Sequence, residues 1–340
     1  MKAYIAYAPH HGGLVDIPEP ELAPDEALIR VEAASVCHSD LDIMDGHRVH
    51  LLRMPVVLGH EFAGRAAKLG RDVRGIDIGQ RYCCEGIVWC GNCRFCRWGD
   101  TSACENYNEL GCTKNGGFAE FCAVPAHMLH PIHNLSADEA SNIEPAGNGY
   151  HAAKSSDIRE GHSVVVIGPG PIGLYALQFA ALYKPEKLIM AGTREERLAA
   201  ARALGATHTV NIRECEAYEA IMDITSGKGA DRVIQCATTA SAVELGLRVM
   251  GKNARLAIEG HVSMDIPVNF GAFIEKPLDA IVGVCGVTHQ NYIDVIALAE
   301  AGKVNFGPII THRFALGAIG EVFQMMRDKA PGLIKAVLHP

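Results

Sequence analysis

The chain has 340 residues, of which 49% are hydrophobic and 21% charged, as in a globular protein of about two domains. Its net charge of −8, without a long basic run, argues against nucleic acid as a partner. Residues 164–183 carry no charge, but Gly168-Pro169-Gly170-Pro171 interrupts them. We therefore expect a buried strand and helix there, and no membrane partner.

The first 145 or so residues are predicted to be rich in β-structure and loops, because short apolar runs alternate with glycine and proline. From Gly161 onward the pattern changes to strands alternating with amphipathic helices, which predicts parallel βαβ units with helices on both faces of the sheet. The expected strands before and after this change cover residues 27–34, 81–84 and 118–124, then 163–167, 187–191, 207–210, 232–236 and 255–258. The expected helices cover residues 172–182, 195–204, 216–225 and 240–250.

The last part of the chain is expected to return to the first domain, because one nucleotide-binding unit is already complete before it. It contains two predicted helices, at 292–301 and 318–328, and a final strand at 335–338. We therefore predict an α/β protein with a doubly wound Rossmann domain over residues 148–285. Residues 1–147 and 286–340 would form the second, β-rich domain.

Four cysteines with the spacing C-x2-C-x2-C-x7-C, namely Cys90, Cys93, Cys96 and Cys104, give the strongest local signal. Four thiolates so close in sequence can enclose one tetrahedral zinc ion and leave no position for a substrate. Disulfides are disfavoured, because the N-terminus has no apolar signal core and a reducing cytoplasm is expected. The last gap is too long for a ferredoxin-type iron–sulfur motif, and a zinc ribbon would pair two distant C-x2-C knuckles. The pattern therefore predicts a structural zinc site.

A glycine-rich segment predicts where a dinucleotide binds. Gly168, Gly170 and Gly173 form the pattern G-x-G-x-x-G after an apolar strand, and Pro171 and Ile172 open the following helix. The first glycine permits a tight turn, the second lets a pyrophosphate approach, and the third lets helix and strand pack closely. The free amide groups of the helix N-terminus would face the anion.

The end of the next strand indicates which nicotinamide is preferred. An NAD site usually has an acidic residue there, which bonds to the ribose hydroxyls. Here Gly192, Thr193 and Arg194 follow the strand, and Arg197 lies one turn further on. The missing carboxylate, the hydroxyl and the guanidinium groups favour NADP, with NAD as the alternative. Arg194 could instead only cap a solvated helix start beside Glu195 and Glu196.

A second group of metal-type residues is scattered through the first domain: Cys37, His60 with Glu61, and Glu144. A thiolate, an imidazole and a carboxylate suit zinc, and three protein ligands leave one position open. Sequence spacing alone does not bring these residues together. A lone cysteine or histidine is more often a packed core residue than a ligand.

Several motifs together resemble the zinc-containing medium-chain dehydrogenase/reductase superfamily, which includes zinc alcohol, polyol and threonine dehydrogenases. The matching pieces are in the same order and cover nearly the whole chain. They are Cys37-His38-Ser39-Asp40, Gly59-His60-Glu61-Phe62-Ala63-Gly64, the four-cysteine loop, Gly116-Gly117-Phe118-Ala119-Glu120, Glu144-Pro145, the glycine motif and Lys335-Ala336-Val337-Leu338.

This resemblance implies that the β-rich domain is GroES-like and that Cys37, His60 and a glutamate bind a catalytic zinc. In polyol-dehydrogenase-like members the glutamate matches Glu61, with Glu144 near the metal water or exchanging with Glu61. Ser39 matches the hydroxyl that passes the substrate proton outward. Alcohol dehydrogenases often have a histidine three positions later, where this chain has Asp42. His47 or a cofactor hydroxyl could take over that step.

The expected function is that of a cytoplasmic, zinc-dependent dehydrogenase that transfers hydride between an alcohol or polyol, or the matching ketone, and NADP(H). The alternatives are an NAD-linked polyol or threonine-type dehydrogenase, and a catalytically silent zinc-binding member of the fold. The resemblance also implies a homodimer or homotetramer.

Overall fold

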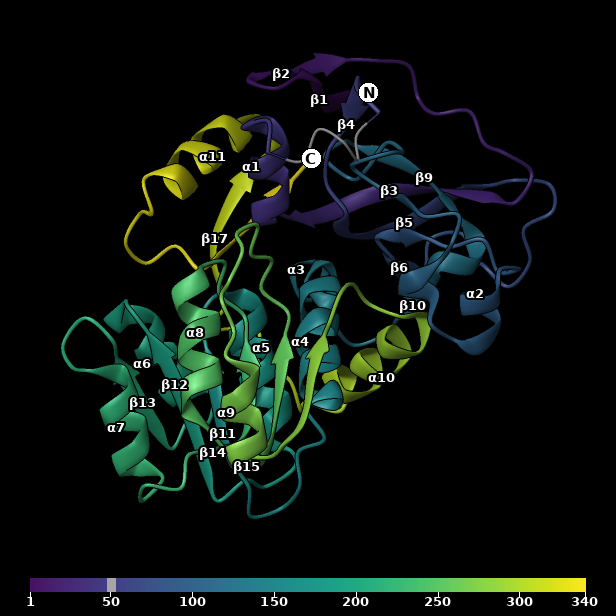
Figure 1. Ribbon diagram of the computed structural model, residues 1–340. Helices are drawn as coiled ribbons and strands as arrows, with labels where there is room; N and C mark the ends of the chain where they lie inside the picture. The colour runs from purple at the N-terminus through teal and green to yellow at the C-terminus, as the bar shows by residue number, and fades with distance from the viewer. Residues whose placement is uncertain (48–52) are drawn as a thin grey trace. The chain divides into compact units, whose positions relative to one another are not determined.

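The computed structural model describes residues 1–47 and 53–340. Contacts within the chain divide it into two compact units, which are described separately. Unit 1 comprises Met1–Glu144 and Val287–Pro340, and unit 2 comprises Pro145–Gly286. The colours of Figure 1 show that unit 1 is built from both ends of the chain.

Unit 1 is built around a mainly antiparallel sheet in the order β10-β6-β5-β3-β18-β17, with β9 also paired to β3. Smaller sheets have the orders β2-β1-β4 and β7-β8. The strands are β1 (Lys2–Ala8), β2 (His11–Asp16), β3 (Glu26–Ser35), β4 (Val56–Val57), β5 (Glu61–Leu69), β6 (Arg81–Cys84), β7 (Ile87–Val88), β8 (Asn108–Glu109), β9 (Phe121–Pro125), β10 (Leu129–Ile132), β17 (Ile310–Ala315) and β18 (Lys335–His339).

The central strand of this sheet is β3, whose apolar residues are almost all buried. The strand predicted at 118–124 begins later than expected, at Phe121. The backbone of Phe118 instead bonds to Leu58 and Tyr4, and Ala119 pairs with Ala3. The segment from Phe118 to Pro125 therefore pairs first with the sheet of β1 and then with β3. A single apolar run in the sequence does not reveal this change of pairing.

Unit 1 also contains five helices among its described residues. They are α1 (His38–Met44), α2 (Arg94–Trp98), α3 (Ala137–Ser141), α10 (His289–Glu300) and α11 (Ile319–Arg327), with 3-10 turns η2 (Thr101–Ala103), η3 (Ala126–Met128) and η4 (Leu316–Ala318). Helix α11 packs on α1 within this unit. The core includes Leu58, Phe62, Phe118 and Val322.

Unit 2 contains a parallel sheet with the order β13-β12-β11-β14-β15-β16. Counted from its first strand the order is 3-2-1-4-5-6, the doubly wound Rossmann arrangement, so the predicted fold is confirmed. The strands are β11 (Ser163–Ile167), β12 (Lys187–Gly192), β13 (His208–Asn211), β14 (Ala230–Gln235), β15 (Met250–Ile258) and β16 (Leu278–Gly283). The side chains of Val165, Ile189 and Val233 are fully buried in this layer.

The helices that follow the strands of unit 2 are α5 (Pro171–Ala181), α6 (Glu195–Ala203), α7 (Ala217–Ile224), α8 (Ala240–Val249) and α9 (Phe270–Glu275). Helix α4 (Ile143–Ser155) begins at the unit boundary. The uncharged residues 164–183 form β11 and α5, as predicted. Within the described part of the chain, no helix is long and apolar enough to cross a membrane.

Candidate active site

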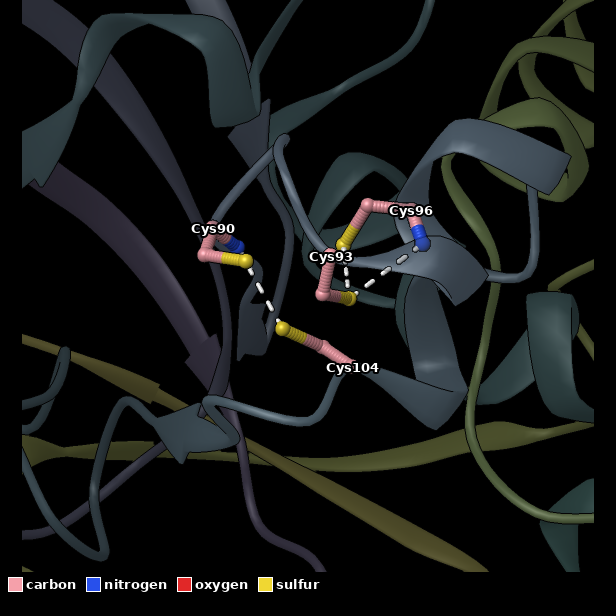
Figure 2. Close-up of side chains that lie close together, drawn as sticks. All are labelled: Cys90, Cys93, Cys96 and Cys104. Carbon is pink, nitrogen blue, oxygen red and sulfur yellow. Dashed lines mark hydrogen bonds between the residues drawn. The ribbon is translucent and has the colours of Figure 1, made fainter.

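The four cysteines of the loop converge in unit 1, and Figure 2 shows their sulfur atoms turned toward one another. All four sulfurs lie within 4.8 Å of one another. The sulfurs of Cys93 and Cys96 are 3.4 Å apart. The twelve cysteines, each of them among the described residues, form no disulfide bond. The arrangement is therefore that of an S4 metal cage and not of a disulfide pair.

Backbone and side-chain N–H groups point at these sulfurs. The amides of Cys96 and Cys90 donate to Cys93 Sγ and Cys104 Sγ over 3.5 and 3.4 Å, and Asn106 Nδ2 donates to Cys90 Sγ over 3.4 Å. The Asn106 hydrogen bond and nearby backbone amides lower the pKa of Cys90 to about 6. Such donors stabilise thiolates, the form that binds zinc, so the residues present fit that ion.

A second group, Cys37, His60 and Glu61, also places one ligand atom per residue within 4.8 Å of the others. Strand pairing explains how distant residues meet. Ser35 at the end of β3 lies opposite Glu61 at the start of β5. Cys37 follows the first strand and His60 precedes the second, so the antiparallel register brings both to one place.

Asp40 supports this group from helix α1. Its carboxylate accepts a hydrogen bond of 2.9 Å from the backbone N–H of Cys37. Its other oxygen, Oδ1, lies 3.7 Å from His60 Nδ1, and both of these buried atoms are without a hydrogen-bond partner. A carboxylate behind a metal-binding imidazole is the usual way to fix the ring, so these atoms fit a metal on the other nitrogen.

The charges around this group are unusual for a protein interior. Burial raises the pKa of Asp40 to about 6. Burial alone would lower the pKa of His60, but a hydrogen bond with Cys37 and the charge of Asp40 raise it well above its usual value. Lys335 forms a buried ion pair with Glu61. The surplus of acidic groups over Lys335 favours a bound cation here.

The predicted residues Glu144 and Ser39 lie near this group but outside it. Glu144, at the start of α4, is close enough to raise the pKa of His60, yet it is not among the three converging residues. A Cβ on Gly86 would lie 3.5 Å from the Cβ of His60 and 3.9 Å from the Cγ of Glu144. Ser39 is half-buried in the first turn of α1.

Asp42, which stands where alcohol dehydrogenases often have a histidine, lies between two imidazoles. Its Oδ1 is 3.7 Å from His38 Nε2 and 3.6 Å from His47 Nδ1. The side chain is 33% exposed, so these three groups can exchange protons with solvent. Sequence reasoning singled out His47 but not its contact with Asp42.

The glycine motif of unit 2 forms a tight turn between β11 and α5. Gly168 has φ of +101°, and a Cβ there would come within 2.9 Å of Ala237. A Cβ on Gly173 would lie 2.0 Å from the carbonyl oxygen of Gly168. Around Gly170, in contrast, a Cβ would meet nothing within 4 Å. The turn thus leaves open space in front of the N-terminus of α5, where Pro171 and Ile172 begin the helix, as a pyrophosphate requires.

The residues after β12 lie at the carboxyl edge of the same sheet. Gly192 is buried, and a Cβ on it would press into the ring of Pro169 at 2.4 Å, so this glycine serves packing against the turn. Arg194 is the N-cap of α6. Burial and the charge of Arg194 lower the pKa of Arg197 to about 10. Glu195 is paired with Arg202. Two neighbouring guanidinium groups here suit an anion, and Thr193 beside them is exposed.

These features define a class: an oxidoreductase with a Rossmann unit for a dinucleotide and a β-rich unit with metal-type clusters. Residues 23–134 match the alcohol dehydrogenase GroES-like domain, and residues 171–301 match the zinc-binding dehydrogenase family. The L-threonine 3-dehydrogenase of Cronobacter sakazakii is 32% identical over 339 residues, covering 98% of both chains. The chain therefore belongs to the zinc-containing medium-chain dehydrogenases/reductases, and the predicted family and GroES-like domain are confirmed.

Solved structures agree with this assignment. A structure from Sinorhizobium meliloti 1021, assigned to the zinc-binding dehydrogenases and bound to NADP, is 26% identical with a TM-score of 0.93 over 100% of this chain and 99% of that one. Galactitol-1-phosphate dehydrogenase from Escherichia coli is 26% identical with a TM-score of 0.91 over all of both chains. The chain is thus an oxidoreductase acting on CH–OH groups, of a class that uses zinc and a nicotinamide.

Proposed function

We propose that this chain is a zinc-dependent alcohol or polyol dehydrogenase that transfers hydride between a secondary alcohol, or the matching ketone, and NADP(H). The observation that carries the proposal is the convergence of Cys37, His60 and Glu61 on one buried place in unit 1. A thiolate, an imidazole and a carboxylate together suit a catalytic zinc with one open position, which a catalytically silent relative does not require.

In this proposal Cys37, His60 and Glu61 would hold the catalytic zinc, with Glu144 near the metal-bound water or exchanging with Glu61. Asp40 fixes the ring of His60, and Lys335 balances the charge of Glu61. Cys90, Cys93, Cys96 and Cys104 hold a structural zinc. When bound, the zinc would supply a Lewis acid that favours ionisation of the substrate hydroxyl, and the nicotinamide coenzyme would supply the hydride acceptor.

The chain's own residues carry the proton away from the substrate. Ser39 accepts it, since its hydroxyl can donate and accept hydrogen bonds in turn. Asp42 and His47, 3.6 Å apart, then pass it to solvent in place of the histidine of alcohol dehydrogenases. Replacing His47 with Asn should lower the rate of alcohol oxidation, because the proton then loses this route to solvent.

The arginines after β12 support NADP as the preferred coenzyme. Gly168, Gly170 and Gly173 hold the pyrophosphate against the N-terminus of α5, and Arg194 and Arg197, with Thr193, bind the 2′-phosphate. Arg194→Glu should reverse the preference from NADP⁺ toward NAD⁺. Arg159→Glu is the matched control, because Arg159 is exposed and precedes β11 at the opposite edge of the parallel sheet. An unchanged coenzyme preference in the Arg194 variant would refute the phosphate site.

A second candidate is an NAD-linked threonine-type dehydrogenase. It is favoured by the relative from Cronobacter sakazakii, whose name gives L-threonine as its substrate and which matches over 98% of the chain. The same alternative includes an NAD-linked polyol dehydrogenase.

A panel of initial rates separates these functions. Secondary alcohols, polyols and L-threonine are tested with NADP⁺ and with NAD⁺, before and after removal of zinc by a chelator. The main proposal predicts turnover of an alcohol or polyol that prefers NADP⁺ and disappears with the metal. Turnover of L-threonine with NAD⁺ but not with NADP⁺ supports the second candidate. Turnover that continues after all zinc has been removed contradicts both proposed functions.

We also propose that the chain forms a homodimer or homotetramer, as its family resemblance implies. Sedimentation equilibrium of the purified protein should give two or four times the chain mass of 36.5 kDa. A monomer at micromolar concentration would contradict the assembly.

A further inference from the structure

Unit 1 contains a third group of metal-type ligands that neither proposed zinc site uses. Glu85, His130 and His289 each place one ligand atom within 4.8 Å of the others. The three residues come from distant parts of the chain, so their spacing in the sequence does not predict that they converge.

The two imidazoles point at the same carboxylate oxygen. His130 Nε2 lies 2.8 Å and His289 Nδ1 lies 2.6 Å from Glu85 Oε1. The second oxygen, Oε2, accepts a hydrogen bond of 2.9 Å from Trp89 Nε1. Two nitrogens and one oxygen gathered in this way, with the carboxylate held from behind, form a common ligand set for zinc-like ions.

The fold fixes the positions of these residues. Glu85 follows β6, and its N–H bonds to the carbonyl of Met128 over 3.0 Å, which extends the pairing of β6 with the strand that carries His130. His289 is the first residue of α10, and its N–H donates to Thr101 Oγ1 over 2.8 Å. Backbone hydrogen bonds thus fix the positions from which the three side chains project.

Aromatic neighbours hold the imidazole rings. The ring of Tyr292 stacks on His130 at 5.4 Å with an interplanar angle of 7°. The Tyr292 hydroxyl accepts a hydrogen bond of 3.1 Å from the N–H of Gly86. The ring of Trp89 lies edge-on to His289 at 5.4 Å. A ligand set whose rotamers are fixed in advance loses little entropy on binding an ion.

Glu85 supplies the group with a buried carboxylate. Glu85 is 1% exposed. Burial alone would raise its pKa, but hydrogen bonds from His130 and His289 hold that pKa below its usual value, so the carboxylate is ionised at neutral pH. The His289 side chain is 36% exposed and gives the group contact with solvent, which can supply a water as a fourth ligand.

We propose that Glu85, His130 and His289 bind a divalent transition-metal ion of the zinc class, in addition to the two zinc sites above. The nitrogens that now donate hydrogen bonds to Glu85 would release their protons and coordinate the ion instead. The ion would tie α10, in the returning segment of the chain, to β6 and β10.

A cobalt titration of the metal-free wild-type chain tests this directly, because both other sites contain cysteine. Co²⁺ bound to thiolate gives strong near-ultraviolet charge-transfer absorption, whereas Co²⁺ bound only to nitrogen and oxygen gives visible bands alone. We expect one equivalent per chain that adds visible bands without charge transfer. The absence of such an equivalent would overturn the proposal.

Variants test which residues bind the ion. His289→Asn and His130→Asn should each lower the metal content by one ion per chain relative to His127→Asn. His127 is the matched control, because its ring also contacts Trp89 but it is not in the ligand group. Thiolate charge-transfer bands and circular dichroism show whether each variant is folded. Equal metal content in a folded His289 or His130 variant and the control would overturn the proposal.

Discussion

Lys335 and Glu61 form an ion pair inside unit 1, with side chains only 3% and 1% exposed. Lys335 comes from the last strand, β18, and Glu61 opens β5, so the pair joins the C-terminus to the proposed metal site. Burial alone would lower the pKa of Lys335, but the charge of Glu61 raises it. The lysine is therefore charged, and it balances the charge of the buried Glu61 carboxylate.

Removing Lys335 should destabilise the protein strongly, because a buried charge is left without its partner. Lys335→Met is expected to lower the free energy of unfolding by about 3–5 kcal/mol, measured by urea denaturation of the metal-free protein. Adding Glu61→Gln to this variant should restore part of that loss. If the effects of the two substitutions simply add, the pair is not energetically coupled.

The ion pairs of Glu32 should make the free energy of unfolding decrease in acid. Its carboxylate accepts hydrogen bonds of 2.9 Å from Arg65 Nε and 2.6 Å from Arg81 Nε. Burial alone would raise the pKa of Glu32, but the two arginines lower it. A lowered pKa gives stability that is present above the pKa of the unfolded chain and is lost as pH falls through the folded value.

Glu32→Gln should therefore cost about 1 kcal/mol at pH 7, since the group is partly exposed, and nothing once the wild-type carboxylate is protonated. Denaturation curves at several pH values between 7 and 3 measure this difference. A constant gap between wild type and variant over the whole range would show that the charge of Glu32 is not responsible.

Two glycines of the coenzyme turn should respond differently to alanine. At Gly170 a Cβ meets nothing in the chain, so Gly170→Ala should change the free energy of unfolding by less than about 1 kcal/mol. It should still weaken NADPH binding by about tenfold or more, because the methyl group fills the space in front of the helix.

Gly173→Ala, in contrast, should lower both stability and coenzyme affinity, since its Cβ would collide with the carbonyl of Gly168. Fluorescence titration with NADPH and chemical denaturation measure the two effects. Unchanged NADPH affinity in Gly170→Ala would place the pyrophosphate elsewhere.

The cysteine loop should depend on its metal for structure. Cys104→Ser is expected to remove one zinc per chain and make residues 90–104 sensitive to protease. Cys215→Ser is the control, because Cys215 is exposed and lies outside every ligand group found in the described residues. If Cys104→Ser keeps the zinc content of the control, these cysteines do not hold a zinc ion.

Strands β11 to β15 and helices α5 to α8 of unit 2 could be predicted from sequence, because apolar runs and amphipathic periods there coincide with regular βαβ units, whereas α9 and β16 were not predicted. Helix α4 was not predicted, since Pro145, Gly147 and Gly149 are poor helix formers. Packing explains it: a Cβ on Gly149 would lie 2.7 Å from the backbone of α5, so the glycine permits close contact between helices. The alanine-rich sequence of β5 is equally compatible with a helix. Its strand conformation depends on pairing with β3 and β6.

The candidate metal residues could be named from family motifs, but their partners could not. The roles of Asp40 and Lys335 depend on their contacts with His60 and Glu61, which lie far from them in the sequence. The group of Glu85, His130 and His289 depends on the register of β6 with β10 and on the start of α10. Such groupings follow from strand pairing, which no local sequence pattern specifies.

In the proposed function, Cys37 and His60 share a zinc ion that the dehydrogenase reaction requires. Crystals grown with zinc and NADP⁺, measured on both sides of the zinc absorption edge, test it most directly. We expect an anomalous peak bonded to Cys37 Sγ and His60 Nε2, with the coenzyme pyrophosphate at the Gly168–Gly173 turn. Cys37 and His60 pointing apart, with no anomalous peak between them, would contradict it.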